Sequence, residues 1–163
     1  MNQENLFKVD EKTYGDKYKD HLFEQYKLYI DSAERISERR QNANNYFITI
    51  NAALFTILGL SFKIEFLQNI GWLRSLLSLV GIIICIIFWY LLRSYKQINT
   101  GKFKVIHQIE QHLPLALYDY EWEILGKGKD KKIYYPFSHI ELCIPWVFGI
   151  IYLVIGIICV LFK

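Results

Sequence analysis

The segment whose residue types come closest to a ligand-binding loop is Gly126–Lys132, with the sequence GKGKDKK. Glycines let backbone N–H groups approach a phosphate, and lysines add positive charge. The segment lacks the remaining spacing of a P-loop and does not follow a predicted strand. It therefore predicts a solvated turn or a contact with anionic lipid headgroups through Lys127, Lys129, Lys131 and Lys132, in preference to a nucleotide site.

Histidine and cysteine positions are the next candidates for chemistry. His107, Glu110 and His112 are close in sequence, but the two histidines are five residues apart and face different sides of a helix, so they do not form a metal site. No Ser, Cys or His stands in a recognisable nucleophile setting. The three cysteines lie in apolar runs and are expected to be buried. We expect no metal, no cofactor and no enzymatic activity.

Charged residues cluster just before the first apolar segment, as Arg35, Arg39 and Arg40 with two glutamates between and before them. One interpretation is ion pairing along the helix face with interfacial snorkelling. In the other, Arg40 reaches an acidic partner, because a buried arginine needs one. The candidate partners lie in the later loop of the same chain or of a neighbouring subunit: Glu110, Glu121 and Glu123. Arg39 and Arg40 are also candidates for binding an anion or a lipid headgroup.

Composition places these groups in a membrane protein. Of the 163 residues, 53% are hydrophobic and 21% charged, which is too apolar for an ordinary soluble domain. The net charge of only +3 gives no argument for a nucleic-acid partner. Because about 20 apolar residues cross a bilayer as a helix, we expect three membrane spans at residues 46–62, 70–92 and 143–162.

The distribution of basic residues predicts the orientation of these spans. Eight Lys and Arg residues precede Tyr46 and eight more lie between the second and third spans, whereas the first link holds only Lys63. The positive-inside rule then places the amino terminus and the long loop in the cytoplasm, and the first link and the carboxyl terminus outside. Residues 1–20 are polar and contain no signal-peptide core.

Asn51 is the strongly polar group within the predicted spans. It is expected either to hydrogen-bond between helices or to form a ring of amides around a pore. No ionisable residue lies deep in a predicted span, which argues against a proton-coupled transporter. Small residues at Ser75, Ser78, Gly81 and Cys85, and at Gly149 and Gly156, predict close packing between the second and third spans.

The elements that position these groups follow from periodicity. After a polar, disordered segment at residues 1–16, a seam with alternating steps of four and three predicts one helix over about 17–60, whose part at 17–45 is cytoplasmic and which continues into the first span. Self-packing and packing between subunits remain equally open for this seam. The residues expected to carry assembly are Leu22, Tyr26, Tyr29, Ile36, Arg40, Asn44 and Phe47, with Glu110, Glu121 and Trp122 as loop-side partners.

The loop at residues 93–141 is too long and apolar to be a simple linker, so it is expected to fold. Apolar spacing predicts an amphipathic helix over about 95–113. Asp119 is expected to cap a second short helix that Gly126 stops. Ser138 and Glu141 have the spacing of a capping box before the third span. The fold class is thus an all-α, three-span membrane protein with a folded helical cytoplasmic loop.

Four separated segments carry a family resemblance. The runs Tyr26–Leu54, Asn99–Pro114, Glu121–Leu125 and Ser138–Pro145 are similar, in order, to the RipA-like octameric membrane proteins, a family of small bacterial membrane proteins. The resemblance implies an inner-membrane homo-oligomer of eight subunits that contacts itself and lipids, without established enzymatic activity. We therefore expect a scaffold or a pore. The alternative, suggested by size and layout, is a nucleotide-gated membrane effector of antiphage defence.

Overall fold

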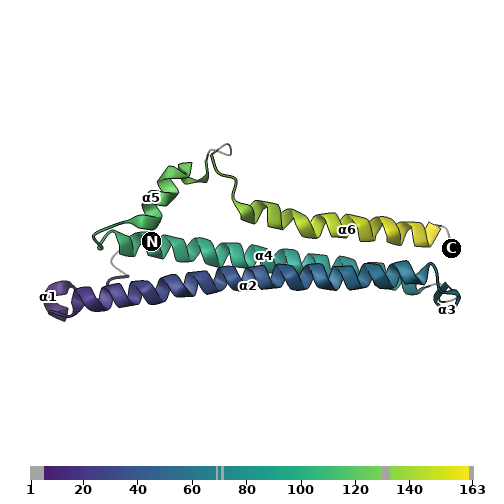
Figure 1. The fold of residues 1–163 in the computed structure, drawn as a ribbon, viewed down its shortest axis with the longest axis horizontal. Helices are drawn as coiled ribbons and strands as arrows, with labels where there is room; N and C mark the ends of the chain where they lie inside the picture. Colours follow the sequence, from purple (N-terminus) through teal and green to yellow (C-terminus); the bar gives the residue numbers. More distant parts are fainter. Residues whose placement is uncertain (1–5, 69, 71, 130–132, 162–163) are drawn as a thin grey trace. The chain divides into compact units, whose positions relative to one another are not determined.

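The computed structural model describes residues 6–68, 70, 72–129 and 133–161, and within these ranges every regular element is a helix (Figure 1). The chain divides into two compact units. We call Met1–Glu38 with Gln97–Tyr135 the polar unit, and Arg39–Lys96 with Pro136–Lys163 the membrane unit. The elements are α1 (Glu11–Tyr14), α2 (Tyr18–Ser61), α3 (Glu65–Gln68), α4 (Leu73–Glu110), α5 (Leu117–Ile124), the 3-10 turn η2 (Gly126–Gly128) and α6 (Phe137–Leu161).

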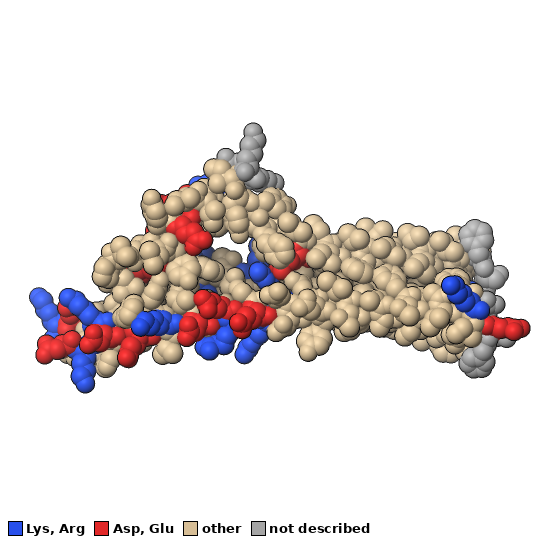
Figure 2. All heavy atoms as spheres, in the orientation of Figure 1, with Lys and Arg blue, Asp and Glu red and all other residues tan. Residues whose placement is uncertain are grey.

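Three of these helices are long and apolar enough to cross a membrane, namely α2, α4 and α6. Their outward side chains in the membrane unit are mainly Ile, Leu and Val, as expected where the surrounding solvent is lipid. Figure 2 shows Lys, Arg, Asp and Glu gathered over the polar unit, while the face of the membrane unit in view is uncharged over most of its length. The predicted all-α, three-span fold class is confirmed.

The predicted long first helix is also confirmed, because α2 runs without a break from Tyr18 to Ser61. The expectation that residues 1–16 are disordered is wrong for its described part, where α1 forms one helical turn. The Asp10 side chain caps this turn by accepting a hydrogen bond of 2.8 Å from the Thr13 backbone N–H. The hydrogen bonds with Thr13 also lower the pKa of the Asp10 carboxyl.

The second span and the predicted amphipathic helix are one element, which corrects the expected boundary at Arg93. Helix α4 continues from Leu73 to Glu110. The sequence between Arg93 and Gly101 contains no proline, and nothing lies within 4 Å of the position a Cβ would take at Gly101. A helix continues through such a glycine at a small cost in propensity. Helix α4 therefore carries residues of both units.

Aromatic side chains form the core of the membrane unit. Phe47 of α2 stacks on Phe88 of α4 with ring centroids 4.0 Å apart, and Phe55 of α2 stacks on Tyr152 of α6 at 4.7 Å. Tyr152 is completely buried and covers Gly81. This core joins all three spans.

Close packing between α4 and α6, predicted from small residues, is confirmed. A Cβ placed on Gly156 would lie 3.5 Å from the Ser78 Cβ, and one on Gly149 would lie 3.8 Å from the Cys85 Cβ. Small side chains at both positions let the two backbones approach, which is the usual basis of helix association in lipid.

Candidate functional site

The best-formed polar site in the polar unit is built around Glu110, the last residue of α4, which is 1% exposed. Its Oε1 accepts hydrogen bonds from the Tyr26 hydroxyl at 2.8 Å and from the Tyr118 backbone N–H at 3.0 Å. Its Oε2 accepts from the Asp119 backbone N–H at 3.0 Å. One carboxylate thus joins α2, α4 and the first turn of α5.

Glu110 supplies the cap that α5 lacks locally. The residue before the helix is Ala116, which makes no side-chain capping bond. The prediction that Asp119 caps this helix is wrong, because Asp119 lies within the first turn and its carboxylate is 3.5 Å from the His107 ring. The first N–H groups of a helix need acceptors, and the buried Glu110 carboxylate provides both oxygens.

The surroundings of this site raise the pKa of both of its tyrosine hydroxyls. Burial first, and then the hydrogen bond and charge of Glu110, raise the pKa of Tyr26 far above its ordinary value. Burial and the surrounding glutamates also raise the pKa of Tyr118. The Tyr26 phenol therefore stays protonated at neutral pH and donates to Glu110 throughout the physiological range.

A second buried carboxylate, Glu141, organises the membrane unit near the start of α6 and is 3% exposed. Its Oε1 accepts a hydrogen bond of 2.7 Å from the Asn44 side-chain amide, and its Oε2 lies 3.4 Å from Arg40 Nε as an ion pair. Arg40 and Asn44 are four residues apart on α2, so they face the same side. Glu141 therefore joins α6 to α2.

This pairing corrects two expectations from sequence. Within the chain the partner of Arg40 is Glu141, and not Glu110, Glu121 or Glu123. Glu110 is bonded to Tyr26 and α5, and Glu123 pairs with Lys127 at 2.9 Å. The expected capping box of Ser138 and Glu141 is also wrong, because both carboxylate oxygens of Glu141 face α2.

The residues predicted to carry assembly are largely turned toward the interior of their own chain. Phe47 is buried, and the others on α2 are half-buried, namely Leu22, Tyr26, Tyr29, Ile36, Arg40 and Asn44. Tyr29 faces Lys102, whose ammonium lies 4.5 Å from the ring centroid. Self-packing of the seam is thus observed, and a role for the same residues between subunits stays a prediction.

On the loop side, Glu121 is exposed and Trp122 packs locally. The Trp122 ring meets Tyr134 edge-on, and a Cβ on Gly128 would touch it at 3.0 Å.

Asn51 lies in the interior of the membrane unit and is completely buried. Its Nδ2 donates a hydrogen bond of 2.7 Å to the Phe47 backbone carbonyl of its own helix. This geometry corrects the expectation of a bond between helices. The same burial leaves the Asn51 side chain no surface with which to line a pore in this conformation.

The lysine-rich segment forms a turn. Gly126 and Gly128 have positive φ angles of 65° and 67°, and Lys127 between them also has a positive φ of 54°. The Lys127 ammonium pairs with Glu123 one turn earlier. Lys129 and Arg39 are exposed, while Lys131 and Lys132 lie outside the described residues. Lys127 is thus already paired within its own turn.

The two histidines have separate surroundings, as their spacing predicted. His107 faces Asp119, and the His112 ring centroid lies 4.0 Å from that of Phe7. In the part of the chain that the structure describes, no group of three His, Cys, Asp or Glu side chains is placed to hold a metal ion. Both buried carboxylates instead accept from, or pair with, side-chain and backbone donors, so their chemistry is the positioning of helices.

Two features of the membrane unit were not singled out by sequence. One is an exposed row of small residues on α2, recurring at steps of four and three: Asn45, Thr49, Ala52, Thr56 and Gly59. The Thr49 and Thr56 hydroxyls donate to the Asn45 and Ala52 carbonyls of the same helix. This row could have been found in the sequence, because its small residues form a second seven-residue repeat beside the apolar seam.

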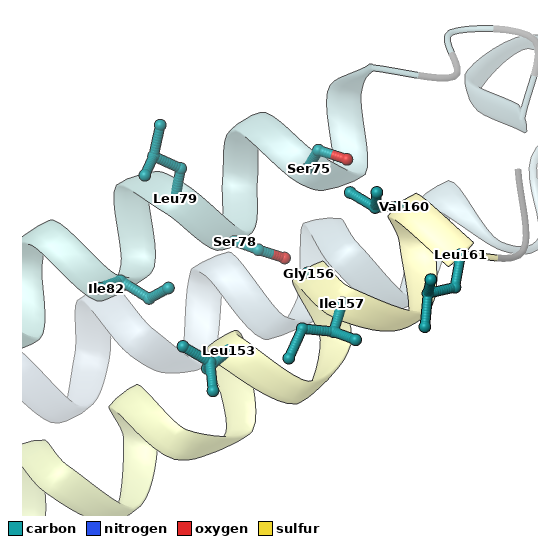
Figure 3. A pocket seen from close by; sticks show the side chains of 9 residues that line it. All are labelled: Ser75, Ser78, Leu79, Ile82, Leu153, Gly156, Ile157, Val160 and Leu161. Carbon is teal, nitrogen blue, oxygen red and sulfur yellow. The ribbon is translucent and has the colours of Figure 1, made fainter.

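The other feature is an open groove of about 460 Å³ between α4 and α6 (Figure 3). Its lining is apolar apart from two serines, and it includes Leu79, Leu153 and Ile157. The Ser78 hydroxyl in this lining is buried and has no hydrogen-bond partner among the described residues. The close approach of Ser78 to Gly156 brings the walls of this groove together.

Comparison with known proteins agrees with this architecture. No curated protein and no solved structure matches the chain. The sequence model of one family does match, over residues 23–162, which include α2 from Phe23 onward, all of α4 and α6, and both buried carboxylates. The chain belongs to the octameric membrane protein family (8xMP).

Proposed function

We propose that the protein is a homo-oligomeric scaffold of the bacterial inner membrane, assembled from eight copies and without a catalytic step. The family name supports the eight-subunit assembly. The charge distribution supports an orientation with the polar unit in the cytoplasm and the carboxyl terminus outside, because both lysine- and arginine-rich segments belong on the cytoplasmic side.

The observation that carries the scaffold role is the apolar outward surface of α6 in the membrane unit. The buried polar residues of this unit are turned inward, namely Asn51, Ser61, Ser78 and Glu141. The outward residues of α6 from Val147 onward are apolar wherever they are exposed, among them Ile150, Val154 and Ile158. A surface of this kind is suited to lipid and to other apolar helices, and it does not favour a water-filled path.

A pore is the second candidate, and one observation favours it. The α2 row that includes Thr49 and Thr56 places small hydroxyl side chains on an outward face of a span. If eight copies placed this face around a common axis, the axis would carry rings of threonine. Asn51 would not contribute, because it is buried in each subunit.

The experiment that separates these functions is a single-particle reconstruction in lipid nanodiscs, combined with conductance recordings in planar bilayers. The scaffold proposal expects an eightfold ring whose centre is closed or filled with lipid, and no conductance above that of empty bilayers. A conducting ring lined by α2, blocked by Thr56→Trp and unaffected by Ile150→Trp on the outward face of α6, would overturn it in favour of the pore. A monomer would overturn both.

The nucleotide-gated effector remains the alternative from sequence, and it predicts a cellular effect. The nucleotide would bind to basic residues, either Arg39 and Arg40 or the lysines of residues 127–132. Of these, Arg40 and Lys127 already pair with carboxylates. Expression of the protein with a nucleotide-synthesising partner should depolarise cells if it is an effector. The scaffold proposal expects an unchanged membrane potential, measured with a voltage-sensitive dye.

A further inference from the structure

One end of the membrane unit carries cations and aromatic rings at the height of the lipid headgroups. Arg74 and Arg93 bound an uncharged stretch of α4, which is roughly 28 Å long at 1.5 Å per residue. The hydrocarbon core of a bilayer is about 30 Å thick, so Arg93 lies at the boundary between hydrocarbon and headgroups. In the proposed orientation this boundary is the cytoplasmic one.

Tryptophan rings accompany Arg93 at this boundary. The Arg93 guanidinium lies 5.5 Å from the centroid of the Trp89 ring, one turn earlier on α4. The Trp89 ring meets the ring of Trp146 on α6 edge-on, with centroids 6.1 Å apart, and Trp146 is 61% exposed. Tryptophan rings at the ends of spans lie at headgroup level. The cation and the two rings therefore form one surface that α4 and α6 share.

A second cation, Lys96, lies on the same face of α4 as Arg93, because three residues separate them. The Lys96 ammonium is 3.4 Å from Nε2 of His139 on α6. His139 and Trp146 are seven residues apart, so they share a face of α6. Both helices thus turn nitrogen-bearing side chains and aromatic rings toward the same junction.

The charge of this junction is positive. The segments of α4 and α6 that build it, residues 86–100 and 137–150, contain one carboxylate, Glu141. Glu141 is buried and pairs with Arg40 of α2. Arg93 is exposed, and among the described residues no carboxylate forms an ion pair with it. The junction is therefore complementary to an anion from outside the chain.

The exposed side chains beside the rings indicate what kind of anion this is. Ile86 lies one turn from Trp89 and is 53% exposed, and Ile150 lies one turn from Trp146 and is 59% exposed. Both are on the side of the rings toward the centre of the membrane. A free phosphate would leave this apolar surface uncovered, whereas the acyl chains of a phospholipid cover it.

We infer that Trp89, Arg93, Lys96, His139 and Trp146 form a binding site for one anionic phospholipid. The lipid phosphate lies at Arg93 and Lys96, where charge-assisted hydrogen bonds hold it, and the acyl chains lie along the two tryptophans. Basic sites between spans on the cytoplasmic side suit anionic headgroups. Only the choice of leaflet, and not the binding itself, depends on the proposed orientation.

The test is native mass spectrometry of the full-length protein in detergent, titrated with dioleoylphosphatidylglycerol or with dioleoylphosphatidylcholine, which has no net charge. We expect the phosphatidylglycerol to bind about fivefold more tightly or better. Arg93→Gln should lower the affinity for it about fivefold, and Arg93→Lys should restore most of the loss. Lys104→Gln is the matched control, because it removes an equal charge from an exposed position farther along α4.

The possible results separate this site from other roles of Arg93. Equal binding of the two lipids, or an equal loss in Lys104→Gln, would overturn the inference, because the attraction would then be general to a basic surface. Smaller oligomers of Arg93→Gln with an unchanged lipid preference would also overturn it and make Arg93 a contact with a carboxylate of another copy. A parent protein that is not an octamer would overturn the proposed assembly alone, because bound lipid is counted per subunit.

Discussion

The contact between Gly81 and Tyr152 gives the most exact prediction of this structure. A Cβ added at Gly81 would lie 2.6 Å from three ring atoms of Tyr152. Carbon atoms in favourable contact are about 3.5–4.0 Å apart. The ring cannot retreat easily, because Tyr152 is completely buried and stacks on Phe55 at 4.7 Å. Gly81→Ala therefore forces the α4 and α6 helices apart or displaces the ring.

The magnitude follows from two opposing effects. Overpacking of a close-packed core by one methyl group costs about 1–3 kcal/mol. The better helix propensity of alanine returns up to about 1 kcal/mol. Gly149→Ala is the matched control on the other side of the same helix pair, because its new Cβ would make an ordinary contact of 3.8 Å with Cys85. We expect Gly81→Ala to be less stable than Gly149→Ala by about 2 kcal/mol.

The assay is reversible unfolding in mixed detergent micelles, followed by circular dichroism as the fraction of denaturing detergent rises. Truncation of the ring in Tyr152→Leu should abolish the difference, so the double variant with Gly81→Ala should be no less stable than Tyr152→Leu alone. Equal stability of Gly81→Ala and Gly149→Ala would refute the reasoning, since it would show that α4 and α6 do not approach at Gly81.

Three other predictions concern the buried carboxylates. Glu110→Gln turns an amide NH2 toward one of the donors from which Glu110 now accepts a hydrogen bond, and it should destabilise the polar unit by about 1–3 kcal/mol. The α5 amides should then exchange hydrogen faster than those of the α2 span. Unchanged hydrogen exchange in α5 would contradict the capping role of Glu110. Because burial and Glu110 raise the pKa of Tyr26, the folded protein holds this proton at pH values where the unfolded chain has lost it. The free energy of unfolding should therefore fall as the pH rises above about 10. Denaturant titrations between about pH 8 and pH 11 should show a shallower fall for Tyr26→Phe than for the parent protein. An equal slope in the two proteins would contradict the raised pKa of Tyr26. Arg40→Met removes the cation that pairs with Glu141 and should lower the free energy of unfolding by about 3 kcal/mol. The double variant Arg40→Met with Glu141→Leu should recover most of this loss. A double variant as unstable as the single one would show that the two side chains do not act as a pair.

The three spans and the long first helix could be predicted from the sequence. Both depend on properties that add up along a short stretch, namely apolar content over about 20 residues and the recurrence of apolar side chains around a helix. The small residues at Ser78, Gly149 and Gly156 were equally informative, because close helix approach in lipid needs side chains of that size whatever the neighbouring helix is. Family membership then followed from segments spread along the chain.

The partners of the buried polar groups were decided by tertiary structure. Arg40 meets Glu141, and Glu110 caps a helix that begins seven residues after it. The burial of Asn51 and the outward direction of Tyr120 were likewise decided by tertiary structure. Such pairings depend on the rotation and height at which packed helices meet, and one residue of difference turns a side chain by about 100°. Local sequence determines that a helix forms and which stripe is apolar, whereas only the packed helices determine which distant donor a buried carboxylate faces.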